Sequence, residues 1–404
     1  MVNSDLIPVD DAINRLVGQA RPVSDTEKVA LTASLDRVLA VDYTVPADVP
    51  PADNSAVDGY AVRAGDLVSG TVLPVSGRVA AGQTPGSLEP GTAIRIFTGA
   101  EIPAGADSVV MQEFVTLTDN GIAIDAPVTR GQNIRRQGQD LARGELALAK
   151  GTRVRAQEMG LLGSMGVTEL EVLVRLKVAI ITTGDELVDP GKPLGPGQIY
   201  NSNRFTLLGL LAKAGCEVML CENLEDTREA TRQTLERAAT GADFIITTGG
   251  VSVGEEDHIR TVLEESGQLS LWRLASKPGK PLAFGTMGDT PVLGLPGNPA
   301  AVLVAFLVIG MPYIRACQGR TGTTGAGERV PAGFSTHKPS VRREFLRARR
   351  EMSAEGPVIN AFPNQNSGIL SSACWADGLA VVPENGTISA GDPVTYYSFA
   401  ELLE

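Results

Sequence analysis

The pattern of hydrophobic and polar positions changes character along the chain. Residues 7–16 carry apolar side chains at helical spacing and predict an amphipathic first helix. Between residues 44 and 140, short Val- and Ile-rich runs such as 92–98 and 108–116 alternate with Gly/Pro turns. This alternation predicts an all-β region without a long helix.

From residue 174 onward, strand-like runs alternate with amphipathic stretches. Such alternation predicts a parallel sheet of βα units. The apolar run at 300–312 is too short to span a bilayer and predicts a buried helix. The predicted strands are 175–182, 217–221 and 243–248, and the predicted helices are 202–213, 227–239 and 256–265.

A Gly/Thr-rich segment after Gly319 predicts a linker. Residues 335–404 again show short strands between Gly, Pro and Asn turns, which predicts a small C-terminal β domain. The expected fold class is therefore multidomain, α/β plus β.

The composition of the chain limits the kinds of ligand and the compartment that we expect for this protein. The 404 residues include 35 Lys and Arg against 47 Asp and Glu, a net charge of −12. This balance argues against a general nucleic-acid binder, although an acidic protein can still contain a basic pocket for an anionic ligand. The four cysteines lack zinc-ligand spacing, and the N-terminus is polar without a signal sequence. We therefore expect a cytoplasmic protein with no nucleic-acid or membrane partner.

Two predicted strands end in similar Gly-rich loops, TTGDEL at 182–187 and TTGGVSVGEEDHI at 247–259. Ligands bind at the carboxyl ends of parallel strands, where glycines allow close approach and expose amide groups. One such loop alone could be only a tight turn. Two such loops in one sheet, each followed by carboxylates, indicate an anionic ligand with a metal counter-ion. The candidate ligand contacts are Thr183, Gly184, Gly249, Gly250 and Ser252.

Two further segments suit an oxyanion. SKPGKPLAFG at 276–285 presents Lys277 and Lys280 on a proline-stiffened loop, although a solvated pair of lysines is the ordinary alternative. In GLPGNPA at 294–300, Pro296 precedes Asn298, a plausible N-cap for a buried helix whose positive N-terminal end favours anions.

The β-rich region holds its own polar candidates. Asp58 lies in the turn-rich PPADNSAVDGYAV, Thr98 in FTGAEIPAGADSVVMQE, and Asp140 in IRRQGQDLARGE. Taken singly, these segments are typical of surface turns and salt bridges.

Seven motifs occur in order along the chain, and together they carry a specific resemblance. They are DNSAVDGYA, RIFTGAEIPAGADSVVMQE, RRQGQDL, TTGDEL, TTGGVSVGEEDHI, KPGKPLAFG and GLPGNPA. In this combination the chain resembles the molybdopterin molybdenumtransferase family, which includes the E domain of gephyrin.

The resemblance implies an architecture of four domains. A molybdopterin-binding-like α/β domain with a parallel sheet takes residues 5–23 and 176–320. A discontinuous linking domain takes 24–46 and 142–175, an inserted β-rich domain 47–141, and a C-terminal β-barrel 326–404. The resemblance also implies a homodimer whose active cleft is shared between subunits.

The same resemblance implies roles for individual residues. Arg273 stands where a lysine is common in the family, and Ala301 stands where a serine is common, so its side chain offers no hydroxyl to an oxyanion. Arg342 and Ser367 occupy positions implied to contact molybdate, together with Lys277 and Lys280. The implied catalytic residues are Asp58, Thr98, Asp140, Glu186, Asp226 and Asp257, of which Asp226 and Asp257 would hold Mg²⁺.

The implied reaction is transfer of molybdate to adenylylated molybdopterin, with release of AMP and the molybdenum cofactor. Two alternatives stay open: a non-catalytic scaffold of the same fold, and another nucleotide- or pterin-handling enzyme such as an adenylyltransferase. The sequence does not identify a dedicated partner, for which a molybdopterin adenylyltransferase and molybdoenzyme acceptors are the candidates.

Overall fold

A computed structural model describes residues 6–68, 70–124, 126–225, 227–250, 258–266, 268–279, 281–322 and 325–404. The chain forms two compact units, each described here by itself. Unit 1 comprises residues 1–27, 36–38 and 172–404, and unit 2 comprises residues 28–35 and 39–171.

A seven-stranded sheet, in the order β1-β20-β22-β23-β19-β15-β18, forms the centre of unit 1. It is mixed rather than wholly parallel, because β22 runs antiparallel to both of its neighbours. The prediction from alternating elements missed this reversed strand, which returns directly after a loop without a crossover helix. The strands are β1 (Leu6–Ile7), β15 (Lys177–Thr183), β18 (Glu217–Leu224), β19 (Phe244–Thr248), β20 (Leu269–Leu274), β22 (Pro281–Met287) and β23 (Thr290–Leu295).

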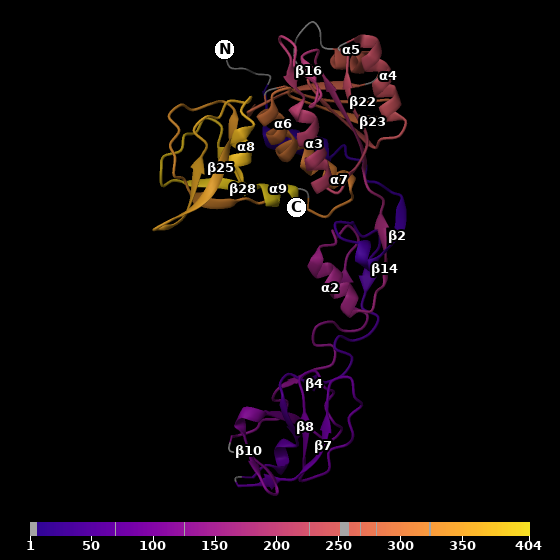
Figure 1. Ribbon diagram of the computed structural model, residues 1–404, viewed down its shortest axis with the longest axis vertical. Coiled ribbons are helices and arrows are strands. Elements are labelled where there is room, and N and C mark those ends of the chain that lie inside the picture. The colour runs from indigo at the N-terminus through magenta and orange to yellow at the C-terminus, as the bar shows by residue number, and fades with distance from the viewer. Residues whose placement is uncertain are drawn as a thin grey trace. The chain divides into compact units, whose positions relative to one another are not determined.

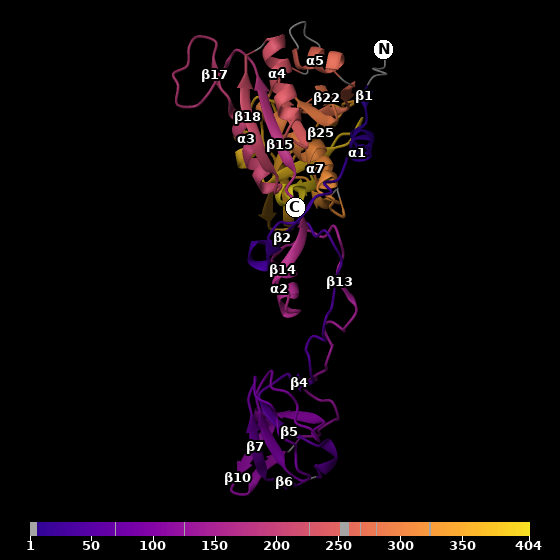
Figure 2. The same cartoon turned by 90° about the vertical axis from the view of Figure 1, so that its right-hand side faces the viewer.

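Helices cover both faces of this sheet (Figures 1 and 2). Alternate side chains of a strand point to opposite faces, and the central strands are apolar on both. Val178 and Ile180 pack into one core, whereas Ala179 and Ile181 pack into the other. The first core includes residues of α1 (Val9–Val17), α3 (Ser202–Lys213) and the helix after β23; the second includes residues of α4 (Arg228–Ala239) and α5 (His258–Ser266).

The helix ends follow local sequence signals. The Asn201 side chain accepts a hydrogen bond from the Arg204 amide at the start of α3, and Thr227 caps α4 in the same way. Gly215 follows α3 with a φ of +74°, a conformation that favours glycine. These ends lie within a residue of the sequence prediction.

The apolar run after β23 forms one long helical stretch. It consists of α6 (Pro299–Ala305), a π-helical turn (Phe306–Gly310) and α7 (Met311–Cys317). At 19 residues it is long enough to cross a membrane by length and composition, which the sequence prediction underestimated. Because 83% of its apolar window is buried inside the protein, it is a core helix, as predicted.

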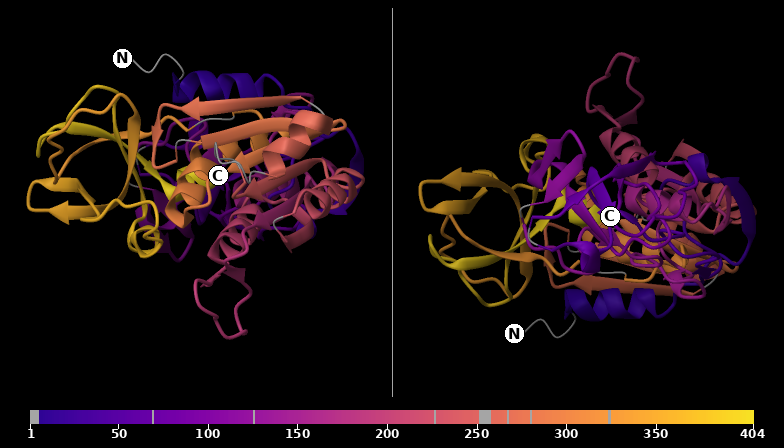
Figure 3. Two further views of the ribbon diagram at one scale, coloured as in Figure 1. Left: turned by 90° about the horizontal axis from the view of Figure 1, so that it is seen from above. Right: turned by 90° about the horizontal axis from the view of Figure 1, so that it is seen from below.

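The C-terminal part of unit 1 is a β domain with a core of its own. In Figure 3 its strands, in yellow and orange, curve around that core. Two short helices, α8 (Ser371–Trp375) and α9 (Phe399–Leu403), were not predicted. The strands are β24 (Glu328–Pro331), β25 (Arg343–Ser353), β26 (Gly356–Ala361), β27 (Gly378–Val382) and β28 (Pro393–Ser398).

Unit 2 is β-rich, as the turn-punctuated sequence predicted. Its largest sheet has the order β7-β8-β5-β9, and a second sheet has the order β10-β11-β6. A Cβ on Gly59 would lie 1.9 Å from the Val110 carbonyl oxygen, so the β5–β9 pairing requires glycine there. The strands are β5 (Gly59–Val62), β6 (Val72–Leu73), β7 (Val75–Val79), β8 (Ala93–Ile96), β9 (Ser108–Met111), β10 (Val115–Thr118) and β11 (Gly121–Ile124).

The remaining elements are short. Unit 2 contains one α-helix among its described residues, α2 (Ala156–Ser164). Three 3₁₀ turns cover Leu31–Ala33, Ala64–Asp66 and Gln112–Phe114. The remaining strands are β2 (Thr26–Ala30), β3 (Tyr43–Thr44), β4 (Asn54–Ser55), β12 (Ile134–Arg135), β13 (Leu146–Leu148), β14 (Glu169–Leu173), β16 (Leu187–Val188), β17 (Ile199–Tyr200) and β21 (Ser276–Lys277).

Candidate functional site

A cleft of about 580 Å³ lies at the carboxyl ends of β15, β19 and β23 in unit 1. This is the edge of the sheet at which a ligand is expected in an α/β fold. Several residues from distant loops, all singled out from the sequence, therefore line one site. They are Thr183, Glu186, Gly249, Pro296, Asn298 and Ser367.

The strand ends meet through close backbone contacts. Gly249 has a φ of +82°, and a Cβ there would lie 2.8 Å from the Thr183 carbonyl oxygen. Gly250 also has a positive φ, of +63°. A side chain would be strained at these positions, so glycine is required for the turn itself as well as for any ligand approach.

Glu186 is the carboxylate that the structure places on the cleft wall. A Cβ on Gly184 would lie 2.6 Å from its Oε2 atom, so the carboxylate folds back over that glycine. The Glu186 carbonyl accepts a 2.8 Å hydrogen bond from the Ile199 amide, which ties the loop to β17. The catalytic role of Glu186 stays a prediction.

The start of α6 forms another wall. Pro299 occupies the first helical position, as predicted. Asn298 is the N-cap residue, as predicted, although its side chain makes no capping hydrogen bond among the described residues. The Ala300 amide donates a 2.9 Å hydrogen bond to the Ser367 carbonyl. That bond brings the C-terminal β domain to the edge of the cleft.

The segment that carries Lys277, here called the lysine loop, pairs with the same domain. β21 pairs with β25, with Lys277 opposite Glu344, and the two side chains form a 3.0 Å ion pair. Lys277 remains about half exposed in this pair. Arg273 lies on β20, exposed at its pairing with Pro281, and does not line the cleft as far as the structure is described.

Arg347, which the sequence analysis did not single out, is buried beside Ser367. Its side chain is fully buried on β25. It donates hydrogen bonds of 3.0 Å to the Ser372 hydroxyl and to the Asn366 carbonyl. Burial lowers the pKa of Arg347 to about 10, and no ion pair accompanies it within the described ranges.

This buried cation stands next to a loop that lines the cleft. Arg342 lies at the start of the same segment, half-buried, with its amide bonded to the Ser340 hydroxyl. Its implied molybdate contact stays a prediction. The segment contains several arginines, and no sequence signal distinguishes the buried one, because burial depends on the loop at 362–370.

Asp226 and Asp257, the metal ligands implied by the resemblance, lie outside the described residues. The predicted substrate contacts Ser252 and Lys280 also lie outside them. Within the described ranges, the side chains form no group of three or more His, Cys, Asp and Glu residues suited to a metal ion. The magnesium site stays a prediction.

Unit 2 brings two of its predicted residues together. Asp58 accepts hydrogen bonds of 2.8 Å from both the amide and the hydroxyl of Thr98. These bonds, the backbone one foremost, hold the pKa of Asp58 below its ordinary value, so it is a carboxylate at neutral pH. Asp140 is exposed elsewhere in this unit, with its amide bonded to the Val49 carbonyl.

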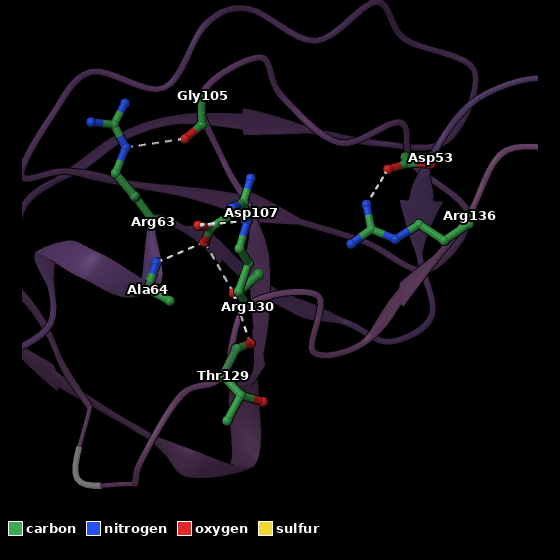
Figure 4. Close-up of polar contacts among 9 residues, drawn as sticks. Asp53, Arg63, Ala64, Gly105, Asp107, Thr129, Arg130 and Arg136 are labelled. Atoms are coloured by element: carbon green, nitrogen blue, oxygen red, sulfur yellow. Dashed lines mark hydrogen bonds and ion pairs between the residues drawn. The ribbon is translucent and has the colours of Figure 1, made fainter.

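Neighbouring carboxylates in unit 2 are structural. The Asp53 carboxylate accepts a hydrogen bond of 2.8 Å from the Gln137 amide. It also pairs with Arg136 at 2.5 Å, as Figure 4 shows. Asp107 accepts a 2.7 Å hydrogen bond from the Ala64 amide, also drawn in Figure 4. These contacts fix turns of the same unit as Asp58, which directly precedes β5.

Comparisons with known proteins cover nearly the whole chain. Residues 7–166 match the MoeA N-terminal region (domain I and II), residues 179–316 a probable molybdopterin binding domain, and residues 329–399 the MoeA C-terminal region (domain IV). A molybdopterin molybdenumtransferase of Haemophilus influenzae is 38% identical over 98% of this chain and 100% of its own length. The chain belongs to the molybdopterin molybdenumtransferase family.

Other members of the family are similar at comparable levels. Molybdopterin molybdenumtransferase of Synechococcus elongatus is 36% identical, over 91% of this chain and 93% of its own length. The crystal structure of the molybdopterin biosynthesis moeA protein from Pyrococcus horikoshii OT3 superposes with a TM-score of 0.83. It is 30% identical and covers 98% of this chain and 100% of its own. The resemblance inferred from seven motifs is thereby confirmed.

Proposed function

We propose that this chain transfers molybdate to adenylylated molybdopterin, releasing AMP and the molybdenum cofactor. The observation that carries the proposal is the cleft, where Gly-rich strand ends, the α6 N-terminus and the Ser367 loop meet. The positive end of the helix dipole at the start of α6 favours an anion such as the pyrophosphate of an adenylylated substrate. Family membership supports the same substrate class.

Molybdate would bind between the C-terminal domain and the lysine loop. Lys277 supplies one cation, and the buried Arg347 supplies another beside Ser367. A buried guanidinium without an ion pair in the described part of the chain attracts an oxyanion strongly, because the local dielectric constant is low. Arg342 is a further candidate contact. The residues act by positioning and electrostatics, without a covalent nucleophile.

The chain would use a divalent cation, Mg²⁺, held by Asp226 and Asp257. A bound Mg²⁺ would neutralise phosphate charge. Support for this part comes from the family resemblance, and Glu186 is a carboxylate on the cleft wall. Asp257→Ala should abolish AMP release. Unchanged release in that variant would remove the metal assignment.

We also propose a homodimer in the cytoplasm, in which Asp58, Thr98 and Asp140 of one subunit complete the cleft of the other. Mixing Asp58→Asn protein with Lys277→Met protein tests this arrangement, after subunit exchange. Partial recovery of activity in the mixture would support a shared site. Two inactive variants that stay inactive when mixed, despite verified exchange, would refute it.

The decisive experiment measures AMP release and reconstitution of a molybdenum-free apo-enzyme, with purified protein, adenylylated molybdopterin, Mg²⁺ and molybdate. Molybdate-dependent AMP release and active product are expected. Lys277→Met should reduce both, whereas Lys177→Met, an exposed lysine at the opposite end of β15, should not. Tight substrate binding without turnover would instead favour the scaffold alternative, with Arg273 and Ala301 examined first.

A further inference from the structure

The floor of the cleft contains polar groups that the proposed anion contacts do not use. Asn203 and Thr248 both line the cleft, and each is more than nine-tenths buried. The Oδ1 atom of Asn203 and the Oγ1 atom of Thr248 have no hydrogen-bond partner in the described part of the chain. Buried polar groups are nearly always paired, so two unpaired groups in one cleft need an explanation.

The orientation of the Asn203 amide is fixed by its other end. Its Nδ2 atom donates a 2.7 Å hydrogen bond to the Gly297 carbonyl, at the start of the α6 wall. The unpaired atom is therefore the oxygen, which can only accept a hydrogen bond. A phosphate or molybdate oxygen is itself an acceptor and cannot satisfy it. The matching ligand group is an N–H or O–H donor.

The preceding residue, Thr247, serves as a control for Thr248. Thr247 is equally buried on β19, and its hydroxyl also lacks a partner among the described residues. Successive residues of a strand point to opposite faces, and only Thr248 lines the cleft. A difference in ligand affinity between variants at the two positions would therefore come from a contact in the cleft, and not from the loss of a buried threonine hydroxyl in general.

We propose that Asn203 and Thr248 form the pair that recognises the nitrogen heterocycle of the bound substrate. Asn203 accepts a hydrogen bond from a ring N–H or amino group, and the Thr248 hydroxyl bonds a neighbouring ring atom. Ligand entry displaces the atoms that cover these two groups, because the unpaired oxygens are buried, while the Asn203 amide keeps its bond to Gly297. This inference rests on the proposed function for the identity of the ring.

Two rings of an adenylylated pterin carry this donor chemistry: the pyrimidine part of the pterin, and adenine. Both present an N–H beside an acceptor atom. Binding of a neutral, unphosphorylated pterin and of adenosine to the full-length protein, measured separately by calorimetry, distinguishes them. Because these probes carry no charge, electrostatic attraction to Lys277 and Arg347 does not contribute to the measured affinity.

The first comparison is Thr248→Val with Thr247→Val. Each replaces a buried unpaired hydroxyl with a methyl group of similar shape, so both proteins should fold with unfolding midpoints at or above that of the wild type. Thr248→Val should weaken binding of one ring about tenfold, the scale of one net hydrogen bond, and Thr247→Val should not. Equal affinities in the two variants would overturn the assignment of Thr248.

The second comparison separates the two ends of the Asn203 amide. Asn203→Asp keeps an acceptor but loses the donor to Gly297, whereas Asn203→Leu loses both. Retained ring binding in the Asp variant with about tenfold loss in the Leu variant is expected. Equal loss in both would make Asn203 only a support for Gly297, and failure of the wild type to bind either ring would overturn the proposal.

The outcomes also separate this inference from the proposed function. A difference between Thr248→Val and Thr247→Val in ring binding, without any molybdate-dependent AMP release, would support the inference and reject the transferase reaction. Normal AMP release together with identical ring affinities in the two variants would support the transferase reaction and reject the inference.

Discussion

Arg347 provides the sharpest quantitative test of the oxyanion site. The guanidinium is fully buried, and burial lowers its pKa to about 10. The difference from an ordinary arginine corresponds to about 3 kcal/mol of unfavourable burial. Two hydrogen bonds, to Ser372 and Asn366, return about 3 kcal/mol at the lower end of the range for bonds to a charged group. The two contributions therefore nearly cancel, and the charge adds little net stability to the protein by itself.

The perturbation is Arg347→Met, which keeps most of the side-chain volume and removes the charge. We expect the free energy of unfolding to change by less than about 1 kcal/mol without anion, because the two terms nearly cancel. Because the pKa of Arg347 is lowered, its cost is present at every pH below about 10 and is relieved only above it. The small effect should therefore be the same at pH 6 and pH 8.

Molybdate should separate the variant from the wild type. An anion at about 100 times its dissociation constant stabilises a protein by about 2.7 kcal/mol, and Arg347→Met should lose most of this gain. Urea unfolding followed by tryptophan fluorescence, with and without molybdate, measures both quantities. Arg350→Met is the matched control, since Arg350 lies on the same strand in an exposed pair with Glu328. Its unfolding should respond to molybdate as the wild type does.

Two results would refute the reasoning. A loss of 3 kcal/mol or more without anion would mean that Arg347 neutralises a buried carboxylate, as a broken ion pair would. Stabilisation of Arg347→Met by molybdate equal to that of the wild type would mean that the oxyanion binds elsewhere.

Two further predictions concern thiol chemistry and the glycine turn. Burial raises the pKa of Cys216 to about 12, whereas Cys374 is exposed. Iodoacetamide at pH 8 should therefore alkylate Cys374 first and Cys216 only after unfolding. Similar alkylation rates of the two cysteines in the native protein, measured by mass spectrometry, would contradict the burial of Cys216. Gly249→Ala places a Cβ 2.8 Å from the Thr183 carbonyl oxygen at a φ of +82°, and should cost about 1–3 kcal/mol and raise the KM for adenylylated substrate. Unchanged unfolding and KM in that variant would show that the turn tolerates a side chain.

The sequence by itself determined the local elements and the family. Apolar periodicity and capping residues placed α3 and α4 to within a residue, because these signals act within one turn of helix. Gly-rich motifs after β15 and β19 located the cleft, since the carboxyl ends of parallel strands share one edge of a sheet.

Only the tertiary structure decided what depends on distant segments. The reversal of β22 follows from strand pairing across the sheet, which no local pattern encodes. Arg347 and Arg342 belong to one arginine-rich run, and only packing against the 362–370 loop buries the former. The unpaired groups of Asn203 and Thr248 are likewise invisible in the sequence, because whether a polar atom finds a partner is a property of the folded surroundings.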